Sequence, residues 1–327
     1  MRPIPAYAVV VILAVLLAPI AHAQTVTLRL AHASSTGSLI DQAVLRFAGE
    51  VSRLTAGKVK IQDFPNGELG DEGPIAEGVG SGAIDIGLGG VVDPIDPRLN
   101  VLALPFLFSS FAQVHAVLDG PFGKRLLTMG AAHGYHMLGF LDSGFRDFAD
   151  TRRPIVTPAN LKGLKIRVPP IPVILQTMRA FGALPQSIPF DQVYTALQSH
   201  VVDGVEPELR DFYDQKWYEV VKYLSLSNYI WTANYWYMNK ARYDSLTPAE
   251  QRAIDQAVAD TTAWYRGQLG AVYASILHKL PDYGVKVNKL DTAPFRAMVA
   301  PIYKHFAELW GAELVASARA TADATQH

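Results

Sequence analysis

Apolar and polar residues recur with two periods in the first part of the chain, and these periods predict alternating strands and helices. Alternation with a period of two predicts β-strands over residues 26–30, 59–64 and 83–88. Between the first two strands, five apolar residues recur every three or four positions, which predicts a helix that ends near Gly57. A shorter helix is predicted over residues 71–81. This alternation favours a parallel or mixed sheet with helices on both faces.

The same alternation returns in the second part of the chain and predicts a second lobe. We expect a helix over residues 111–129 and a strand over residues 135–141, after which the pattern starts again. The segments expected next are a strand containing Arg146, a strand over 161–169, a helix over 173–181, a strand near 185–189, a helix over 190–197 and a strand over 201–206.

The last part of the pattern predicts how the two lobes are connected. Two aromatic-rich strands, over residues 223–230 and 234–238, are expected to carry the chain back to the first lobe. A capping box with proline at the first helical position, at residues 247–250, predicts a helix that runs to about residue 280. The predicted bounds are 24–144 with 233–272 for lobe I, and 145–232 with 273–327 for lobe II.

Composition excludes several classes of function. Half of the 327 residues are hydrophobic and 18% are charged, which is typical of a globular protein with a large core. The 29 basic and 30 acidic residues give a net charge of −1, so the chain lacks the basic footprint of a protein that binds nucleic acid or an anionic membrane. It contains no cysteine, which removes thiol catalysis, disulfides and cysteine metal sites.

The first 23 residues have the pattern of a secretory signal peptide. Arg2 precedes an apolar run over residues 8–17, and Ala21-His22-Ala23 forms a small-residue cleavage site. The apolar run is shorter than the roughly 20 residues that a membrane-spanning helix needs. We therefore expect cleavage after Ala23 and export to the periplasm.

Two motifs associated with cofactors or metals do not fit their surroundings. Gly78–Ala83 superficially matches the dinucleotide fingerprint, but it stands between a helix and a strand instead of between a strand and a helix. His133 and His136 are three residues apart, but the glycine and tyrosine between them indicate a turn that enters a strand. The sequence has no nucleophile elbow, zinc-protease motif or phosphate-binding loop. It predicts no metal, no cofactor and no enzymatic activity.

One predicted strand contains a single arginine among apolar residues. Leu164, Ile166 and Val168 give this strand a buried pattern, and Arg167 stands between the last two. A buried charge without a partner costs several kcal/mol, so Arg167 needs an anion beside it. That anion is either a structural carboxylate or a ligand.

Aromatic and acidic residues supply further candidates. Trp231, Tyr235 and Trp236 place aromatic rings on both faces of one strand, so one face is expected to line a cleft, with Trp231 as a candidate for ligand contact. Packing in the core is the alternative. Asp203 and Glu206 resemble an acid and base pair, but at the end of a buried strand we interpret them as partners that orient arginines.

Several spaced motifs, in this order, resemble the extracytoplasmic solute-binding proteins of TRAP transporters, the DctP-type family. The resemblance spans nearly the whole chain after residue 23, and the order of the motifs makes it more specific than any one of them. The motifs are Phe64–Gly70, Gly82–Ile86, Leu104–Phe106, Leu161–Pro169, Phe181–Ala183, Phe190–Gln198 and Val201–Glu206.

The resemblance implies a fold and a set of ligand contacts. It implies a two-lobed periplasmic-binding-protein-like α/β fold, with mixed sheets flanked by helices, hinge strands and a long helix bridging the lobes. A small organic acid would bind in the cleft, with Arg167 in a bidentate salt bridge to its carboxylate. Arg146 matches the second basic position of the family, and Phe190 would pack against the ligand. Glu206, interpreted above as a partner that orients an arginine, is expected to support the site from behind.

The resemblance also implies partners, and one departure from the family pattern bears on the ligand. Delivery would be to small and large integral membrane subunits. Many members place an asparagine that bonds the ligand after the glutamate at position 206, whereas this chain has Pro207. We therefore expect a ligand with fewer hydroxyl groups than a sugar acid.

Three alternatives stay open at this point. The protein would otherwise be the receptor of an ATP-driven importer, or a sensor subunit that reports ligand binding to a membrane kinase, because one fold serves several roles. From another class, a secreted lyase or hydrolase would use Arg167 to hold a carboxylate substrate and Asp203 or Glu206 as the base.

Overall fold

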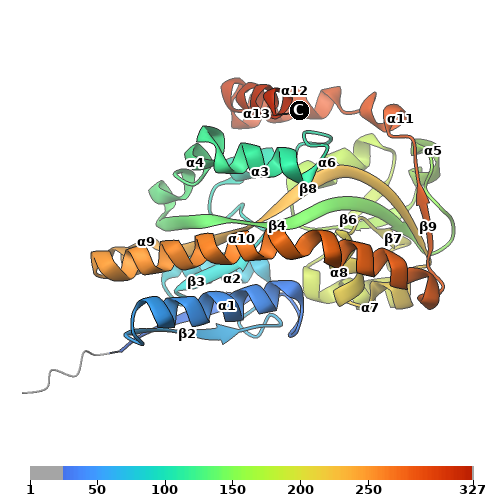
Figure 1. The fold of residues 1–327 in the computed structure, drawn as a ribbon. Helices are drawn as coiled ribbons and strands as arrows, with labels where there is room; N and C mark the ends of the chain where they lie inside the picture. The colour runs from blue at the N-terminus through green and yellow to red at the C-terminus, as the bar shows by residue number, and fades with distance from the viewer. Residues whose placement is uncertain (1–24, 326–327) are drawn as a thin grey trace, which may run out of the picture.

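A computed structural model describes residues 25–325 of the protein. The predicted signal peptide and its cleavage site lie outside the described residues. Nine strands form one mixed sheet within the described part (Figure 1). They are β1 (Val26–His32), β2 (Val59–Phe64), β3 (Ile86–Gly89), β4 (Tyr135–Asp150), β5 (Lys165–Val168), β6 (Leu184–Ser187), β7 (Gly204–Val205), β8 (Tyr223–Asn239) and β9 (Lys286–Lys289).

Helices cover both faces of this sheet, which confirms the mixed α/β fold class. The helices are α1 (Leu39–Leu54), α2 (Glu72–Ser81), α3 (Phe111–Asp119), α4 (Pro121–Leu126), α5 (Pro158–Leu161), α6 (Pro172–Ala180), α7 (Val193–Gln198), α8 (Leu209–Asp214), α9 (Lys240–Asp244), α10 (Pro248–Lys279), α11 (Ala293–Arg296), α12 (Ala300–Trp310) and α13 (Ala312–Ala324). Short 3₁₀ helices are η1 (Pro97–Ala103), η2 (Met129–His133), η3 (Phe190–Gln192), η4 (Trp217–Glu219) and η5 (Leu280–Tyr283).

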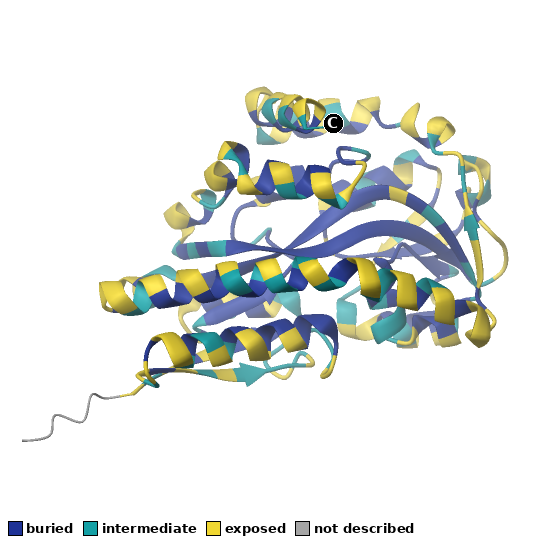
Figure 2. Cartoon of the chain, in the orientation of Figure 1, coloured by how far each residue is buried: buried dark blue, intermediate teal, exposed yellow. Residues whose placement is uncertain are grey.

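The strand order β2-β1-β3-β8-β4-β7-β5-β6 divides the sheet into two halves around a central pair. The parallel strands β1, β2 and β3 lie on one side of β8, and β5, β6 and β7 lie on the far side of β4. The central strands β4 and β8 are antiparallel and buried along most of their length (Figure 2). The two lobes are therefore two halves of one sheet, joined by the pair that both halves share.

Each central strand is continuous where the sequence predicted two separate strands. The chain from residue 135 to residue 150 forms one strand, and the chain from 223 to 239 forms another. The prediction of a break in each was wrong because irregularities in the pairing absorb the interruptions. Register shifts occur between Met137 and Gly139, between Asp142 and Gly144, and between Arg146 and Phe148.

A buried carboxylate stabilises the last of these irregularities. Oδ1 of Asp147 accepts hydrogen bonds from the backbone N–H groups of Ser227 (2.7 Å) and Asn228 (2.9 Å). Asn228 has a φ of 46°, a left-handed conformation that asparagine adopts more readily than most residues. Asp147 thus supplies the acceptor that these two backbone donors lack in the irregular part of the pairing.

Gly144 is required at the middle irregularity. Its φ is 137°, and a Cβ atom there would collide with the Tyr273 hydroxyl and with the Glu208 carboxylate. Any other residue would be strained and would displace the side chains of both Tyr273 and Glu208.

The helix α10 bridges the two halves of the molecule. It packs against α1 on one side of the central strands and against α8 on the other, and it crosses β4 (Figure 1). The capping box at Thr247 and Glu250 is present, and the helix ends within one residue of its predicted end. No helix among residues 25–325 is both long enough and apolar enough to span a membrane.

Two other helical regions differ from the prediction. The helix expected over residues 111–129 is divided into α3 and α4, because Gly120 ends the first helix and Pro121 starts the second. The helices α12 and α13 were not predicted; α12 packs against α6, and α13 packs against α3 and α4.

Candidate ligand-binding site

A cavity of about 40 Å³ lies where the central strands meet loops from both halves of the sheet. When the lobes are given the bounds predicted from the sequence, both of them contribute residues to the wall of this cavity. The lining residues are Ser34, Ile40, Asp71, Glu72, Gly90, Val91, Ser143, Arg146, Arg167, Pro169, Pro170, Ile171, Phe190, Asp211, Trp217, Thr232, Ala233 and Asn234. Three of the five residues predicted to form the site, Arg146, Arg167 and Phe190, are among them.

Arg167 lies in β5 between β6 and β7 and is 2% exposed. Its Nε donates a hydrogen bond to the carbonyl oxygen of Ile188 at 2.9 Å. Within residues 25–325, no carboxylate lies within salt-bridge distance of the Arg167 guanidinium. Burial, together with the nearby Arg146 cation, lowers the pKa of Arg167 to about 10. Arg167 therefore stays charged at neutral pH, and the acidic side chains that share its cavity, Asp71 and Glu72, form no salt bridge with it.

Arg146 is paired inside the protein. Its Nε donates to Oε2 of Glu206 at 2.5 Å, and one terminal nitrogen donates to Oε1 at 2.7 Å. Although burial opposes the charged form, the Glu206 carboxylate holds the pKa of Arg146 above its ordinary value. The Tyr229 hydroxyl adds a third hydrogen bond to Glu206 at 2.6 Å. Glu206 is fully buried, does not line the cavity and holds Arg146 in place.

The two acidic residues considered as a general base, Asp203 and Glu206, are both engaged in salt bridges. Glu206 is held by Arg146 and Tyr229. Asp203 forms a salt bridge with the exposed Arg152 at 2.9 Å and accepts a hydrogen bond from the backbone N–H of Lys165. Glu206 orients an arginine of the site as expected, whereas the arginine that Asp203 contacts is outside the cavity.

Aromatic side chains form one wall. The rings of Phe190 and Trp217 pack edge to face with centroids 5.7 Å apart, and both residues line the cavity. Trp231 is 1% exposed and packs against Phe108 in the core instead of reaching the cavity. The sequence pattern could not show which face of β8 meets the cavity. Trp217 lies outside β8, in η4, and was missed because its segment shows no strand periodicity.

Two acidic side chains from the start of α2 face the same cavity. Oδ2 of Asp71 accepts a hydrogen bond from the backbone N–H of Phe190 at 3.0 Å, which links lobe I to lobe II. Burial and the neighbouring Asp71 charge raise the pKa of Glu72 to about 7. The sequence offered no sign that these residues would lie near Arg167, because 95 positions or more separate them along the chain.

Polar groups on the central strands complete the lining. Ser143 comes from β4, and Thr232 and Asn234 come from β8. The Thr232 hydroxyl is buried and has no hydrogen-bond partner among the described residues. Pro207 is not a lining residue; its carbonyl oxygen accepts a hydrogen bond from the backbone N–H of Asp147. The amide that the cavity does contain comes from Asn234 on β8.

The fold and the site define a two-lobed solute-binding protein, with a buried, arginine-lined cavity between lobes that share their central strands. The chain belongs to the bacterial extracellular solute-binding proteins of family 7, the DctP family, whose sequence model matches residues 30–309. The family resemblance seen in the sequence is thereby confirmed, and with it the expectation of a binding protein rather than an enzyme.

Relatives and solved structures agree with this assignment. The 2,3-diketo-L-gulonate-binding periplasmic protein of Escherichia coli K12 is 32% identical over 256 residues, which cover 77% of this chain and 78% of that protein. The sugar acid binding protein of Advenella mimigardefordensis in complex with galactonate superimposes with a TM-score of 0.88 at 32% identity, covering 93% of this chain and 99% of the other. A TRAP periplasmic solute binding protein of Sulfurospirillum deleyianum with bound succinate gives a TM-score of 0.85 at 28% identity, covering 90% and 98%.

Proposed function

We propose that the protein is the periplasmic component of a TRAP-type secondary transporter and that it binds a small organic-acid anion through Arg167. The observation that carries this proposal is the state of Arg167, a buried guanidinium that faces the cavity without a carboxylate partner among the described residues. A guanidinium fork matches a carboxylate in shape, and each charge-assisted hydrogen bond contributes roughly 1.5–3 kcal/mol.

Arg146 has a supporting role in this proposal. Since Glu206 already neutralises it, Arg146 offers directional N–H donors and little net charge to the ligand. Phe190 and Trp217 supply an apolar surface on the lobe II side. Ser143, Thr232 and Asn234 supply hydrogen-bonding groups on the shared strands.

The cavity supports a compact ligand. Pro207 stands where many family members place an asparagine that bonds the ligand, and it does not line the cavity. Ile40, Val91 and Ile171 add apolar side chains to the wall. We therefore propose a short carboxylate with few hydroxyl groups in preference to a six-carbon sugar acid.

Binding to both lobes would drive transport. A ligand that contacts Arg167 on one side and the Ser34 and Glu72 side of the cavity on the other favours the closed arrangement. The closed form would then dock onto the small and large membrane subunits and release the anion to them. The predicted signal peptide supports a periplasmic location for this step.

The test is a melting-temperature screen of the purified protein over organic acids, followed by calorimetry of each acid that raises the melting temperature. A ligand at 100 times its dissociation constant stabilises a protein by about 2.7 kcal/mol, which such a screen detects. The amide analogue of the best acid should bind at least 100-fold more weakly, because it loses the charge that Arg167 recognises.

Two variants and an uptake assay make the screen decisive. Arg167→Ala should abolish the response to the acid, whereas Arg179→Ala, an exposed arginine on α6, should leave it unchanged. Uptake of the labelled acid in cells should require this protein together with the membrane subunits. Undiminished binding by Arg167→Ala would contradict the carboxylate assignment, and a response confined to six-carbon sugar acids would contradict the compact ligand.

A further inference from the structure

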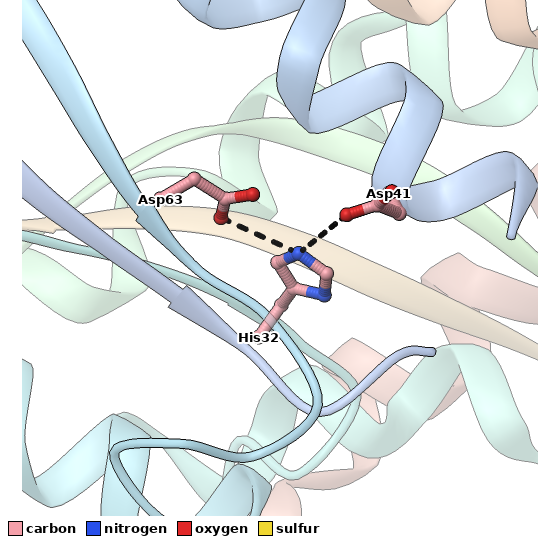
Figure 3. Close-up of side chains that lie close together, drawn as sticks. All are labelled: His32, Asp41 and Asp63. Atoms are coloured by element: carbon pink, nitrogen blue, oxygen red, sulfur yellow. Dashed lines mark ion pairs between the residues drawn. The ribbon is translucent and has the colours of Figure 1, made fainter. Parts of the chain in front are cut away.

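Three side chains outside the cavity converge beneath the loop that follows β1. His32 is the last residue of β1, Asp63 is near the end of the neighbouring strand β2, and Asp41 is in the first turn of α1. One ligand-type atom from each lies within 4.8 Å of the other two (Figure 3). Nine positions separate His32 from Asp41 and 22 separate Asp41 from Asp63, a spacing that matches no sequence motif.

The pairing of β1 with β2 and the position of α1 are enough to bring these three side chains together. In the parallel pairing of β1 with β2, Leu30 lies opposite Asp63, and His32 is on the same face of β1 as Leu30. That face is covered by α1, whose first turn is fixed by a cap in which Ser38 Oγ accepts from the Asp41 N–H. The three side chains therefore point into one space between the sheet and the helix.

His32 is the observation that points to a ligand. It is 0% exposed, and neither of its ring nitrogens has a hydrogen-bond partner among the described residues. Its Nε2 faces the gap between the two carboxylates (Figure 3). Oδ1 of Asp63 also lacks a partner within the described residues. A buried polar ring that makes no hydrogen bond costs stability unless something in the gap binds it.

The separations fit an ion in the gap better than direct hydrogen bonds. Nε2 lies within ion-pair distance of both carboxylates, 3.4 Å from Asp63 Oδ1 and 3.7 Å from Asp41 Oδ1 (Figure 3). Direct N–H···O bonds are about 2.7–3.2 Å long. Two ligands bound tetrahedrally at about 2.0–2.1 Å stand about 3.3–3.5 Å apart, which is close to both values.

Supporting contacts hold one of the carboxylates in the required orientation. Oδ2 of Asp41 accepts a hydrogen bond from the Gly37 N–H at 2.8 Å, so Oδ1 is left to face His32. Metal ligands are commonly oriented by such outer contacts. The Asp63 side chain is 15% exposed although its Oδ1 atom is buried, so the three side chains lie just beneath the surface.

We propose that His32, Asp41 and Asp63 form a binding site for a divalent transition-metal ion of the zinc type. Imidazole with two carboxylates is a donor set that suits Zn²⁺ or Co²⁺, whereas Ca²⁺ and Mg²⁺ prefer oxygen donors alone. The ion would join the ends of β1 and β2 to the start of α1. It would thereby fix the base of the loop that carries Ser34 to the cavity and Ser35 to its contact with Gln215.

The experiment uses the full-length gene product, purified after expression without a histidine tag and treated with a chelator. Zn²⁺, Co²⁺, Ca²⁺ and Mg²⁺ are added separately, and melting temperature and calorimetric stoichiometry are measured. We expect one Zn²⁺ or Co²⁺ per chain, a rise of several degrees in melting temperature, and visible absorption bands from bound Co²⁺. Ca²⁺ and Mg²⁺ should give no comparable shift.

Variants distinguish this site from histidines on the surface. His32→Gln and Asp63→Asn should each weaken Zn²⁺ binding at least tenfold, whereas His278→Gln, an exposed histidine on α10, should bind as the parent does. Asp63→Asn keeps the proposal testable if His32→Gln does not fold, because Asp63 is at the edge of the buried space. Absence of stoichiometric Zn²⁺ or Co²⁺ binding by the parent protein would overturn the proposal, as would unchanged binding by Asp63→Asn.

Discussion

Arg146 and Arg167 are two buried arginines of one sheet that face the same cavity, yet their surroundings differ. Arg146 has a bidentate carboxylate partner in Glu206, which Tyr229 also holds. Arg167 has a backbone carbonyl and, among the described residues, no carboxylate within salt-bridge distance. The pKa shifts run in opposite directions, upward for Arg146 and downward for Arg167. We interpret the internal counterion of Arg146 as the mark of a positioning residue, and its absence at Arg167 as support for the proposal that the ligand binds there.

The largest effect is expected from removing the paired arginine. Arg146→Met would leave the Glu206 carboxylate buried with only the Tyr229 hydroxyl as a partner. Breaking one side of a buried pair costs about 3–5 kcal/mol, so the free energy of unfolding should fall by that amount in urea titrations without ligand. The double variant Arg146→Met/Glu206→Gln should recover part of the loss, and a loss below about 1 kcal/mol would show that the pair is not what stabilises this region.

The matching change at the other arginine should have the opposite sign. Arg167→Met removes a cation that burial destabilises and replaces it with an apolar side chain of similar length. We expect the free energy of unfolding of the ligand-free protein to rise by about 1–3 kcal/mol, while the response to the ligand is lost. If this variant is destabilised as strongly as Arg146→Met, the distinction between the two arginines fails.

A smaller effect concerns the acidic side of the cavity and pH. Burial and the Asp71 charge raise the pKa of Glu72 to about 7, so Glu72 is mostly neutral at pH 6 and mostly ionised at pH 8. Arg167, with a pKa of about 10, stays charged across this range. The ionised Glu72 carboxylate repels the ligand carboxylate, so the affinity for the ligand should fall as pH rises from 6 to 8.

An interaction of about 1 kcal/mol would give roughly a fivefold change in the dissociation constant over that range. Calorimetry at both pH values measures it, and Glu72→Gln should remove the dependence. The stability of the protein also changes with pH, because burial raises the pKa of Asp147 to about 7, but Asp147 does not line the cavity. An affinity that is constant in the parent protein, or that still changes in Glu72→Gln, would exclude Glu72 as the cause.

An effect of similar or smaller size is expected at a neutral contact between the lobes that touches neither arginine. Gln215 Nε2 donates a hydrogen bond to Ser35 Oγ at 2.7 Å. By the bounds predicted from the sequence, Ser35 belongs to lobe I and Gln215 to lobe II, so this contact links the two lobes. Losing one neutral hydrogen bond costs about 0.5–1.5 kcal/mol, so Gln215→Ala should weaken ligand binding about two- to tenfold by disfavouring closure. Gln256→Ala, on the exposed face of α10, should bind normally. Equal affinities for the two variants would show that this contact does not contribute to closure.

Much of the fold was predictable because the apolar residues that recur along the sequence form the buried faces of the helices and strands. The strand β2 has its predicted bounds, and α1 and α10 differ from theirs by only a few residues. The continuity of β4 and β8 could not be predicted, because the groups that sustain them through irregular pairing come from elsewhere in the chain. Asp147 on β4 binds the backbone of β8 at residues 227 and 228, and Gly144 makes room for Tyr273 on α10.

Residues of the candidate site were predictable where their own segment showed an unusual pattern or a family motif. Arg167 was conspicuous because a charge interrupts an apolar strand, and the family resemblance pointed to Arg146 and Phe190. Glu72 and Trp217 lie in segments with ordinary local patterns, and they reach the cavity only through the arrangement of loops around the central strands. The surroundings of Trp231 depend on which face of β8 meets the helices, and periodicity alone does not decide that.

The shared strands β4 and β8 have a consequence for the thermodynamics of binding. Because the lobes are halves of one hydrogen-bonded sheet, their connections are already ordered, and the proposed closing motion need not freeze a flexible linker. Proteins that order loops on binding lose part of their interaction energy as conformational entropy. In this protein that loss would be confined to the ligand and the few side chains around it, so a compact anion with few contacts would still be captured from dilute solution.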